Sequence, residues 1–97
     1  MVKLEYSQNA LDDIERLVDF LIGSDLLAAL STFEVIDDGV QLLKRHPEIG
    51  RLLAASGKRE LVISRGNTGY IAIYAFDKFL NVVVILAIKH QREADFN

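Results

Sequence analysis

The side chains best suited to catalysis lie in the second half of the chain. Cleavage of an RNA backbone needs a base for the 2′-hydroxyl group, cations for the phosphate and an acid for the leaving oxygen. Arginine and lysine can supply the cations, and histidine can act as a base or an acid near neutral pH. The residues that could form such a site are Arg59, Arg65, Lys89, His90 and Arg92.

Four of these five candidates also have an ordinary structural interpretation. His90 stands at the end of a predicted strand, where a histidine is more often a structural residue than a catalyst. Lys89 and Arg92 can be solvated side chains at that strand's end, and Arg59 can pair with an acidic residue on a neighbouring strand or helix. Residue type alone therefore does not separate a catalytic site from a structural cluster.

The sequence predicts neither a metal site nor a cofactor site. The chain has no cysteine, which excludes disulfides and zinc sites of the cysteine type. Asp37 and Asp38 are adjacent in a predicted helix, so their carboxylates point in different directions and make a poor metal site. His46, which precedes Pro47, is interpreted as a residue at a helix end.

Length and composition indicate one globular domain over residues 1–97. Apolar residues make up 51% of the chain and charged residues 26%, which is typical of globular and not of disordered proteins. No apolar run approaches the roughly 18 residues that span a membrane. The N-terminus lacks the basic and apolar regions of a secretion signal. We therefore expect a cytoplasmic protein that does not bind a membrane.

The net charge of −3 is divided unevenly along the chain. Residues 1–43 contain nine acidic and two basic residues, and residues 44–97 contain five acidic and nine basic residues. The basic half could face a polyanion or an acidic protein. The chain as a whole is not as basic as a general nucleic-acid-binding protein.

The pattern of apolar residues predicts an α+β fold. Alternation over residues 2–6 predicts a strand, and Ser7 should cap a helix that stops at Gly23. Ser24 or Asp25 should cap a second helix that ends before residue 47, and the short link makes the two helices an antiparallel hairpin. After a loop over residues 47–58, three antiparallel strands are expected at residues 59–65, 70–76 and 82–89.

The second predicted helix carries a specific packing expectation. Gly39 in its middle costs roughly 1 kcal/mol relative to alanine, so close packing against another element is expected at this point. The stripe expected to be buried consists of Leu26, Leu30, Phe33, Ile36 or Asp37, Val40 and Leu43.

The last two predicted strands are apolar on both faces. Tyr70 and Tyr74 share one face, where they either pack in the core or contact a partner protein, and Ile71 and Ile73 occupy the other. A helix hairpin covers only one side of a sheet. A loop, the C-terminal tail or a partner chain would therefore have to cover the second side.

Several segments together resemble a known protein family over nearly the whole chain, about residues 2–96. The segments are "ALDDIERLVDFL", "HPEIGR", "RELVISRGNTGYIAIYAFD" and "VVVILAIKHQRE". In this order they resemble the RelE/ParE family of toxins from bacterial type II toxin–antitoxin operons. The resemblance is closer to the ParE members than to the RelE members.

This resemblance implies a fold in which the helix hairpin packs on a curved antiparallel sheet. It also implies a small cognate antitoxin that wraps extended and helical segments over the toxin and would cover the apolar strands. ParE-like members are associated with inhibition of DNA gyrase, and RelE-like members cut mRNA on the ribosome. The fold alone does not choose between these activities.

The RelE-like pattern has a dense basic cluster and often a tyrosine or histidine near the C-terminus, and this sequence departs from it. The loop before Arg59 has only Arg51 and Lys58, and Phe96 stands where a hydrogen-bonding aromatic residue is expected. The net charge is also acidic, whereas an enzyme inside the ribosome would benefit from a strongly basic surface.

We therefore expect a ParE-like toxin, not an enzyme, that inhibits DNA gyrase and is neutralised by a ParD-like antitoxin. Contact with DNA would be indirect, through the antitoxin. The alternatives are a RelE-like ribosome-dependent endoribonuclease that uses Arg59, His90 and Arg92, and an inactive toxin kept as a binding module. The residues expected to bind the antitoxin or the target are Arg59, Arg65, Tyr70, Tyr74, Lys89, His90 and Arg92.

Overall fold

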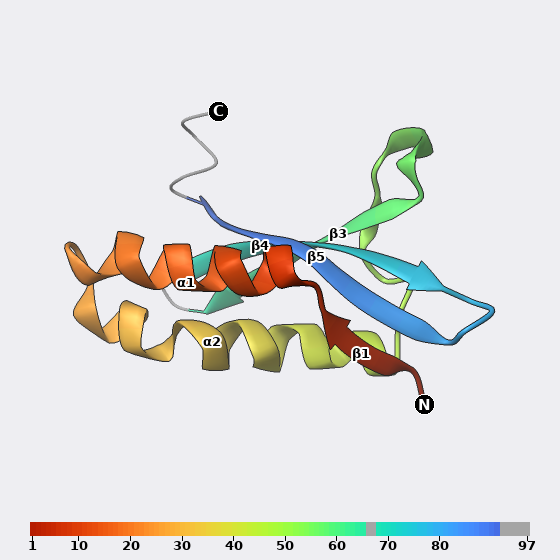
Figure 1. The fold of residues 1–97 in the computed structure, drawn as a ribbon, viewed down its shortest axis with the longest axis horizontal. Helices are drawn as coiled ribbons and strands as arrows, with labels where there is room; N and C mark the ends of the chain where they lie inside the picture. The colour runs from red at the N-terminus through yellow and green to blue at the C-terminus, as the bar shows by residue number, and fades with distance from the viewer. Residues whose placement is uncertain (66–67, 92–97) are drawn as a thin grey trace.

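The computed structural model, in which residues 1–65 and 68–91 are described, has two α-helices packed on a five-stranded sheet (Figure 1). The side chains of Arg65 and Thr68 are outside this description. In chain order the elements are β1 (Lys3–Tyr6), α1 (Gln8–Ile22), α2 (Leu26–Val40), the 3-10 helix η1 (Gln41–Lys44), β2 (Arg51–Leu52), the 3-10 helix η2 (Ala54–Ser56), β3 (Lys58–Arg65), β4 (Thr68–Asp77) and β5 (Val82–His90).

The two helices begin where capping side chains satisfy their first backbone amides. The Ser7 hydroxyl accepts a hydrogen bond from the Ala10 amide at 3.0 Å, and the Asp25 carboxylate accepts one from the Ala28 amide at 3.0 Å. The cap of α2 is therefore Asp25 and not Ser24. As predicted, α1 ends immediately before Gly23 and the two helices form an antiparallel hairpin.

The predicted α+β fold with its three-stranded antiparallel sheet is confirmed, and the sheet is extended at both edges. The strand order is β1-β5-β4-β3-β2, with β1 parallel to β5 and the other neighbours antiparallel. The segment 47–58, predicted as a loop, contains β2 and η2, because Arg51 and Leu52 pair with Glu60 and Arg59.

Side chains of α1 cover the part of the β5 edge that β1 does not reach. Leu86 forms a bulge in β5, and its carbonyl accepts hydrogen bonds from the side chains of Ser7 and Asn9. The Asp13 carboxylate accepts the Ile88 amide at 2.9 Å, and Arg16 donates to the Ile88 carbonyl at 3.2 Å. Asp13 is thus a structural residue.

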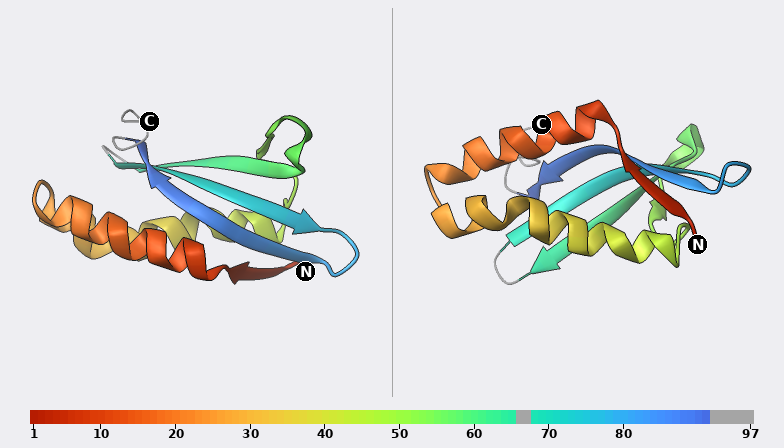
Figure 2. Two further views of the ribbon diagram at one scale, coloured as in Figure 1. Left: turned by 45° about the horizontal axis from the view of Figure 1, so that its top comes forward. Right: turned by 60° about the horizontal axis from the view of Figure 1, so that its bottom comes forward.

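The core lies between the helix hairpin and one face of the sheet, which Figure 2 shows with both helices on the same side. Gly39 explains how closely α2 approaches β3. A Cβ atom at Gly39 would lie 2.7 Å from the side chain of Ile63, so only glycine fits without a shift. The close packing predicted at this position is confirmed.

The predicted buried stripe of α2 is wrong over the first half of the helix. The residues that face the core there are the smaller Ala28, Ala29 and Thr32, whereas Leu26, Leu30 and Phe33 are exposed. Small residues allow α2 to lie close to α1, and the larger apolar side chains point outward as a result. From Ile36 onward the predicted stripe is buried, as expected.

Candidate functional site

Arg59 fixes the loop that precedes β2. Its guanidinium group donates hydrogen bonds to the carbonyl oxygens of Glu48 at 3.0 Å and Gly50 at 2.8 Å. The same group lies 3.6 Å from the Glu48 carboxylate, which also pairs with Lys78 at 3.4 Å. The side chain is 23% exposed, and its donors are directed at the protein's own backbone. This geometry matches the structural interpretation of Arg59.

Tyr74 holds the same loop from the core side. Its hydroxyl accepts a hydrogen bond from the Gly50 amide at 2.9 Å. A Cβ atom at Gly50 would lie 2.6 Å from this hydroxyl oxygen, so the close approach requires glycine. Burial raises the pKa of the Tyr74 phenol, which therefore stays protonated at neutral pH. Tyr74 is fully buried and acts in the core.

His90 and Tyr70 form an aromatic cluster under the other end of the sheet. The Tyr70 ring meets the His90 ring edge-on with a centroid distance of 5.2 Å, and the Phe20 ring of α1 lies 6.1 Å from His90. Tyr70 is fully buried and also hydrogen-bonds to the Thr32 hydroxyl at 3.4 Å. His90 is 3% exposed. Neither side chain is available at the surface of this structure for direct contact with a partner.

The two principal catalytic candidates are not brought together. In the strand register, Arg59 of β3 lies opposite Tyr74 of β4, and His90 of β5 lies opposite Tyr70 of β4. Tyr70 and Tyr74 are four residues apart along β4. At about 3.3 Å per residue, the two backbone positions are separated by at least about 13 Å along the strand direction. Because Arg59 is bound to its own loop and His90 is buried at the other end of β4, this arrangement does not direct both side chains at one phosphate.

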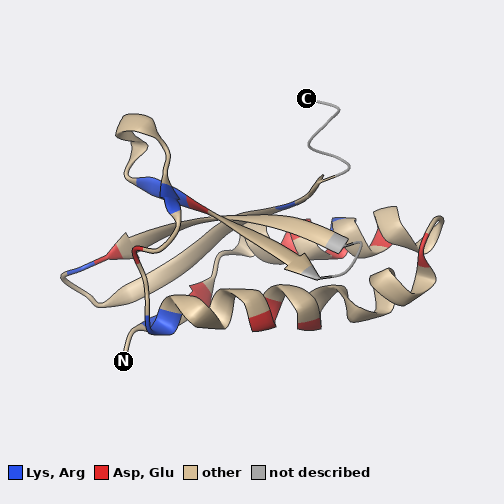
Figure 3. Ribbon diagram, turned by 180° about the vertical axis from the view of Figure 1, so that it is seen from behind, with Lys and Arg blue, Asp and Glu red and all other residues tan. Residues whose placement is uncertain are grey.

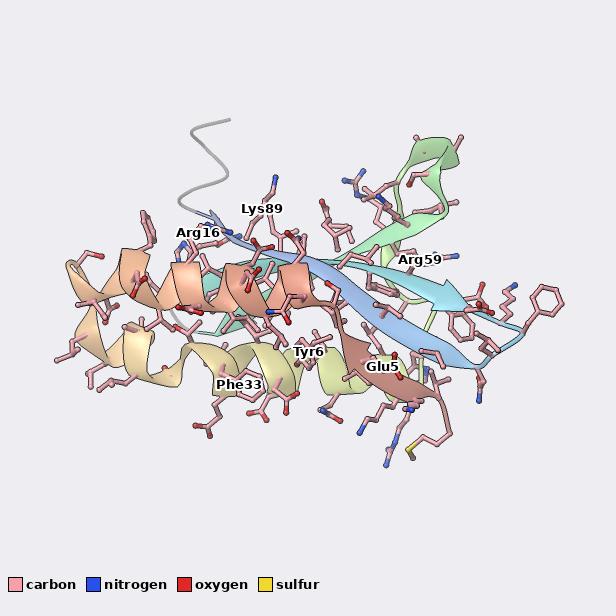
Figure 4. All side chains as sticks on the ribbon, viewed as in Figure 1. Glu5, Tyr6, Arg16, Phe33, Arg59 and Lys89 are labelled. Atoms are coloured by element: carbon pink, nitrogen blue, oxygen red, sulfur yellow. The ribbon has the colours of Figure 1, made fainter. Side chains whose placement is uncertain are left out.

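The remaining candidates lie elsewhere. Lys89 is exposed on the face of the sheet opposite to His90, because neighbouring residues of a strand point to opposite faces (Figure 4). Arg65 is at the far end of β3 from Arg59, where its backbone pairs with Thr68. Arg92 lies outside the described residues. The set predicted from the sequence is therefore divided between the core, the sheet surface and the strand ends.

The face of the sheet opposite to the helices, which we name the open face, is apolar. The strand register places Val62 beside Ile71, and Ile73 beside Ala87. Val62 is exposed and the other three are half-buried. This face also carries charged residues, namely Arg51, Lys58, Glu60, Asp77 and Lys89, and Glu60 pairs with Arg51 of β2 at 3.1 Å. No described element of this chain covers the open face (Figure 2).

A second apolar surface, which the sequence did not reveal, lies on the outside of α2. We name it the α2 patch, and it consists of Leu26, Leu27, Leu30 and Phe33. Leu27 is 80% and Leu30 is 76% exposed. The alternation of small and large apolar residues in "LLAALSTF" is the signal that could have identified it. Phe33 also contacts the ring of Tyr6 on β1, with centroids 6.0 Å apart (Figure 4).

The charged residues of the two α-helices are mostly acidic. The acidic residues are spread along α1 and α2, whereas basic residues mark the beginning of β3 (Figure 3). Among the described residues, no three His, Cys, Asp or Glu side chains are grouped so that they could hold a metal ion. None of the helices in the described part of the chain is long and apolar enough to cross a membrane.

Comparison with known structures shows the same fold in toxins of toxin–antitoxin complexes. The chromosomal ParDE system of P. aeruginosa contains a chain that superposes with a TM-score of 0.75 at 22% identity, covering 93% of this chain and 96% of that chain. The E. coli RelBE complex gives a TM-score of 0.63 at 18% identity, with 91% and 94% of the two chains covered. The RelBE2 complex of Mycobacterium tuberculosis gives 0.63 at 20% identity, with 93% and 91% covered.

The fold is shared by ParDE and RelBE systems, so the family has to be identified from the sequence. No curated protein matches the chain significantly. The family described as the ParE toxin of the type II toxin–antitoxin system parDE matches residues 4–95, which is almost the whole chain. This match agrees with the resemblance carried by the segments quoted above. The chain therefore belongs to the ParE family of toxins of type II toxin–antitoxin systems.

Proposed function

We propose that this ParE-family toxin arrests bacterial growth by binding and inhibiting DNA gyrase, and that a cognate ParD-like antitoxin neutralises it. In this proposal the toxin acts by contact between proteins and not as an enzyme. A ParE-type activity agrees with the family match over residues 4–95. The target and the neutralisation are inferred from the family and from the surfaces described above.

The observation that carries the choice of a non-enzymatic inhibitor is the placement of Arg59 and His90. The guanidinium group of Arg59 is bound to two carbonyl oxygens of its own loop, and His90 is buried among aromatic rings. A nuclease needs its cations and its acid or base around one phosphate. The separation of at least about 13 Å between the two residues favours structural roles for both.

The proposed antitoxin contact is supported by the two uncovered apolar surfaces. No described element of this chain covers the apolar side chains of the open face and the α2 patch, and such surfaces are typical of protein interaction sites. Lys58 and Lys89 at the margins of the open face suit an antitoxin segment that is amphipathic and acidic. The α2 patch suits a second, apolar segment of the same partner.

The runner-up function is a RelE-like nuclease, because the RelBE complexes share the fold at TM-scores of 0.63. In that case Lys89, which lies near the end of the sheet where β3 and β5 terminate, would have to bind the RNA. This hypothesis predicts mRNA cuts phased with codons, which disappear when Lys89 or Arg92 is replaced by alanine.

Expression of the toxin without its antitoxin in a bacterial host distinguishes the two proposals. We expect filamentation and a DNA damage response within the first generations, followed by slow loss of protein synthesis. Co-expression of the neighbouring antitoxin gene should prevent both effects. An immediate stop of translation, with no induction of the DNA damage response, would overturn the gyrase proposal and support the nuclease.

A further inference from the structure

The turn between β4 and β5 exposes two large apolar side chains at one end of the molecule. Phe79 is 101% exposed and Leu80 is 73% exposed. The turn projects beyond the other elements in every view of Figures 1 and 2. Because neither side chain belongs to the core, their apolar character is not explained by the folding of this chain.

The turn is held in one conformation by bonds at both of its ends. The Asp77 carboxylate accepts hydrogen bonds from the amides of Phe79 at 2.9 Å and Leu80 at 3.0 Å. Asn81 adopts a left-handed conformation with φ 56°, which asparagine tolerates well, and its carbonyl accepts the Lys3 amide at 3.0 Å. A partner that binds this turn therefore orders little additional chain, which favours affinity.

The charges beside Phe79 and Leu80 are satisfied within the molecule. Asp77 is occupied by the turn amides, and the Lys78 ammonium group lies 3.4 Å from the Glu48 carboxylate. A nucleic acid or an anionic membrane would be attracted by an excess of cations, whereas the charged groups at the turn are two carboxylates, Asp77 and Glu48, and one ammonium group, Lys78. An uncharged apolar pocket on a protein is the complementary surface.

We propose that Phe79 and Leu80 anchor the toxin in an apolar pocket of the protein that it inhibits. This inference rests on the proposed function of the chain as a protein inhibitor, and it names the part of the toxin that meets the target. It assigns the turn to the target and not to the antitoxin. The open face and the α2 patch serve the antitoxin, and the exposed leucines of α2 lie at the opposite end of the molecule from the turn (Figure 1).

The turn is too small to form a stable interface alone, so we expect it to be one anchor within a larger contact. A buried phenylalanine contributes roughly 150–250 Å², whereas a stable interface needs about 800 Å² from each partner. One feature next to the turn can extend the contact. Ile49 is exposed on the loop whose Glu48 carboxylate pairs with Lys78. Within an interface of that size, a few buried side chains usually carry most of the binding energy.

A pair of matched double variants tests this assignment. Phe79→Ser with Leu80→Ser removes the anchor, and Leu27→Ser with Leu30→Ser removes an equally exposed apolar pair from the α2 patch. Both pairs are solvent-exposed, so each variant should unfold at a temperature close to that of the wild type. Inhibition of purified gyrase and affinity for the purified antitoxin are measured for all three proteins.

We expect the Phe79/Leu80 variant to inhibit gyrase only at concentrations at least roughly 30-fold above those that the wild type needs. This change corresponds to the loss of one binding hot spot. Its antitoxin affinity should stay within about twofold of the wild type. The Leu27/Leu30 variant should show the opposite behaviour. A Phe79/Leu80 variant that inhibits its target as well as the wild type, or that loses the antitoxin instead, would overturn the inference.

Growth arrest without antitoxin separates this inference from the choice of target. If the wild type arrests growth but does not inhibit gyrase, the gyrase proposal fails while the role of the turn is still decided by comparing the variants in cells. Loss of arrest in the Phe79/Leu80 variant alone would support the anchor. Equal arrest by the wild type and this variant would contradict it.

Discussion

Replacing Arg59 with alanine tests whether this arginine holds a loop or serves a reacting phosphate. In the folded chain the guanidinium group donates to the carbonyl oxygens of Glu48 and Gly50 at 3.0 and 2.8 Å and pairs with the Glu48 carboxylate at 3.6 Å. The Arg59→Ala change removes all three interactions. The loop over residues 46–50 then loses its main connection to β3.

The expected loss of stability follows from these contacts. Hydrogen bonds that involve a charged group contribute about 1.5–3 kcal/mol each when they are buried, and water replaces part of that contribution at a partly exposed side chain. The ion pair with Glu48 adds less than about 1 kcal/mol because Glu48 is half-exposed. We expect the free energy of unfolding to fall by roughly 2 kcal/mol. For a domain of this size, the melting temperature should fall by roughly 8–16 °C.

Thermal and urea unfolding of Arg59→Ala, Arg59→Lys and Tyr74→Phe measures this effect. Lysine keeps the charge but cannot reproduce the forked donors of arginine, so its loss of stability should be intermediate. Tyr74 and Arg59 both bind Gly50, through its amide and its carbonyl. The effects of Arg59→Ala and Tyr74→Phe should therefore not be additive, with a coupling energy of at least about 0.5 kcal/mol.

One outcome would refute the structural role of Arg59. If Arg59→Ala unfolds at the wild-type temperature and yet abolishes growth arrest, the arginine must contact the target or a substrate. If the variant is destabilised as expected but remains toxic at a temperature where it is folded, a catalytic role for Arg59 is excluded.

Two further predictions concern the packing of α2. Gly39→Ala should lower the free energy of unfolding by up to about 2 kcal/mol, because overlap with Ile63 costs about 1–3 kcal/mol and the gain in helix propensity offsets only about 1 kcal/mol of this cost. Chemical denaturation measures the change, and a stabilised variant would show that α2 does not approach β3 this closely. The Tyr6 hydroxyl donates to the Asp37 carboxylate at 2.8 Å, and burial together with this bond raises the pKa of the Tyr6 phenol above its usual value. Folding thus favours the neutral phenol. The contribution of this phenol to the stability of the folded chain is complete below about pH 10 and is lost as the pH rises above that value. Tyr6→Phe should lower stability by about 1 kcal/mol at pH 7 and weaken the alkaline dependence, and an unchanged alkaline profile would argue against this bond.

The order of the elements could be predicted from local signals. Ser7 and Gly23 mark the limits of α1 because capping depends on one or two residues, and the strand positions follow from alternation and turn residues. The parallel pairing of β1 with β5 could not be predicted, because Lys3 and Val82 are distant in the sequence and nothing local specifies their register.

The candidate site was less predictable than the fold. Charge and position suggested Arg59 and His90 equally, but whether such a side chain faces a substrate depends on its tertiary partners, here the Glu48 carbonyl for Arg59 and the Tyr70 ring for His90. The outward orientation of Leu30 on α2 was misjudged for a related reason. Hydrophobicity favours burial of the larger residue, whereas the space between packed helices favours the smaller Ala28 and Ala29.

The central claim is that the toxin inhibits gyrase by binding it and does not cut RNA. The most direct measurement is supercoiling of relaxed plasmid by purified gyrase at increasing toxin concentration, with and without antitoxin, alongside mRNA integrity in a translation reaction that contains the same toxin. We predict loss of supercoiling that the antitoxin reverses, with intact mRNA. Normal supercoiling at every toxin concentration, together with codon-phased cuts in the mRNA, would contradict the account.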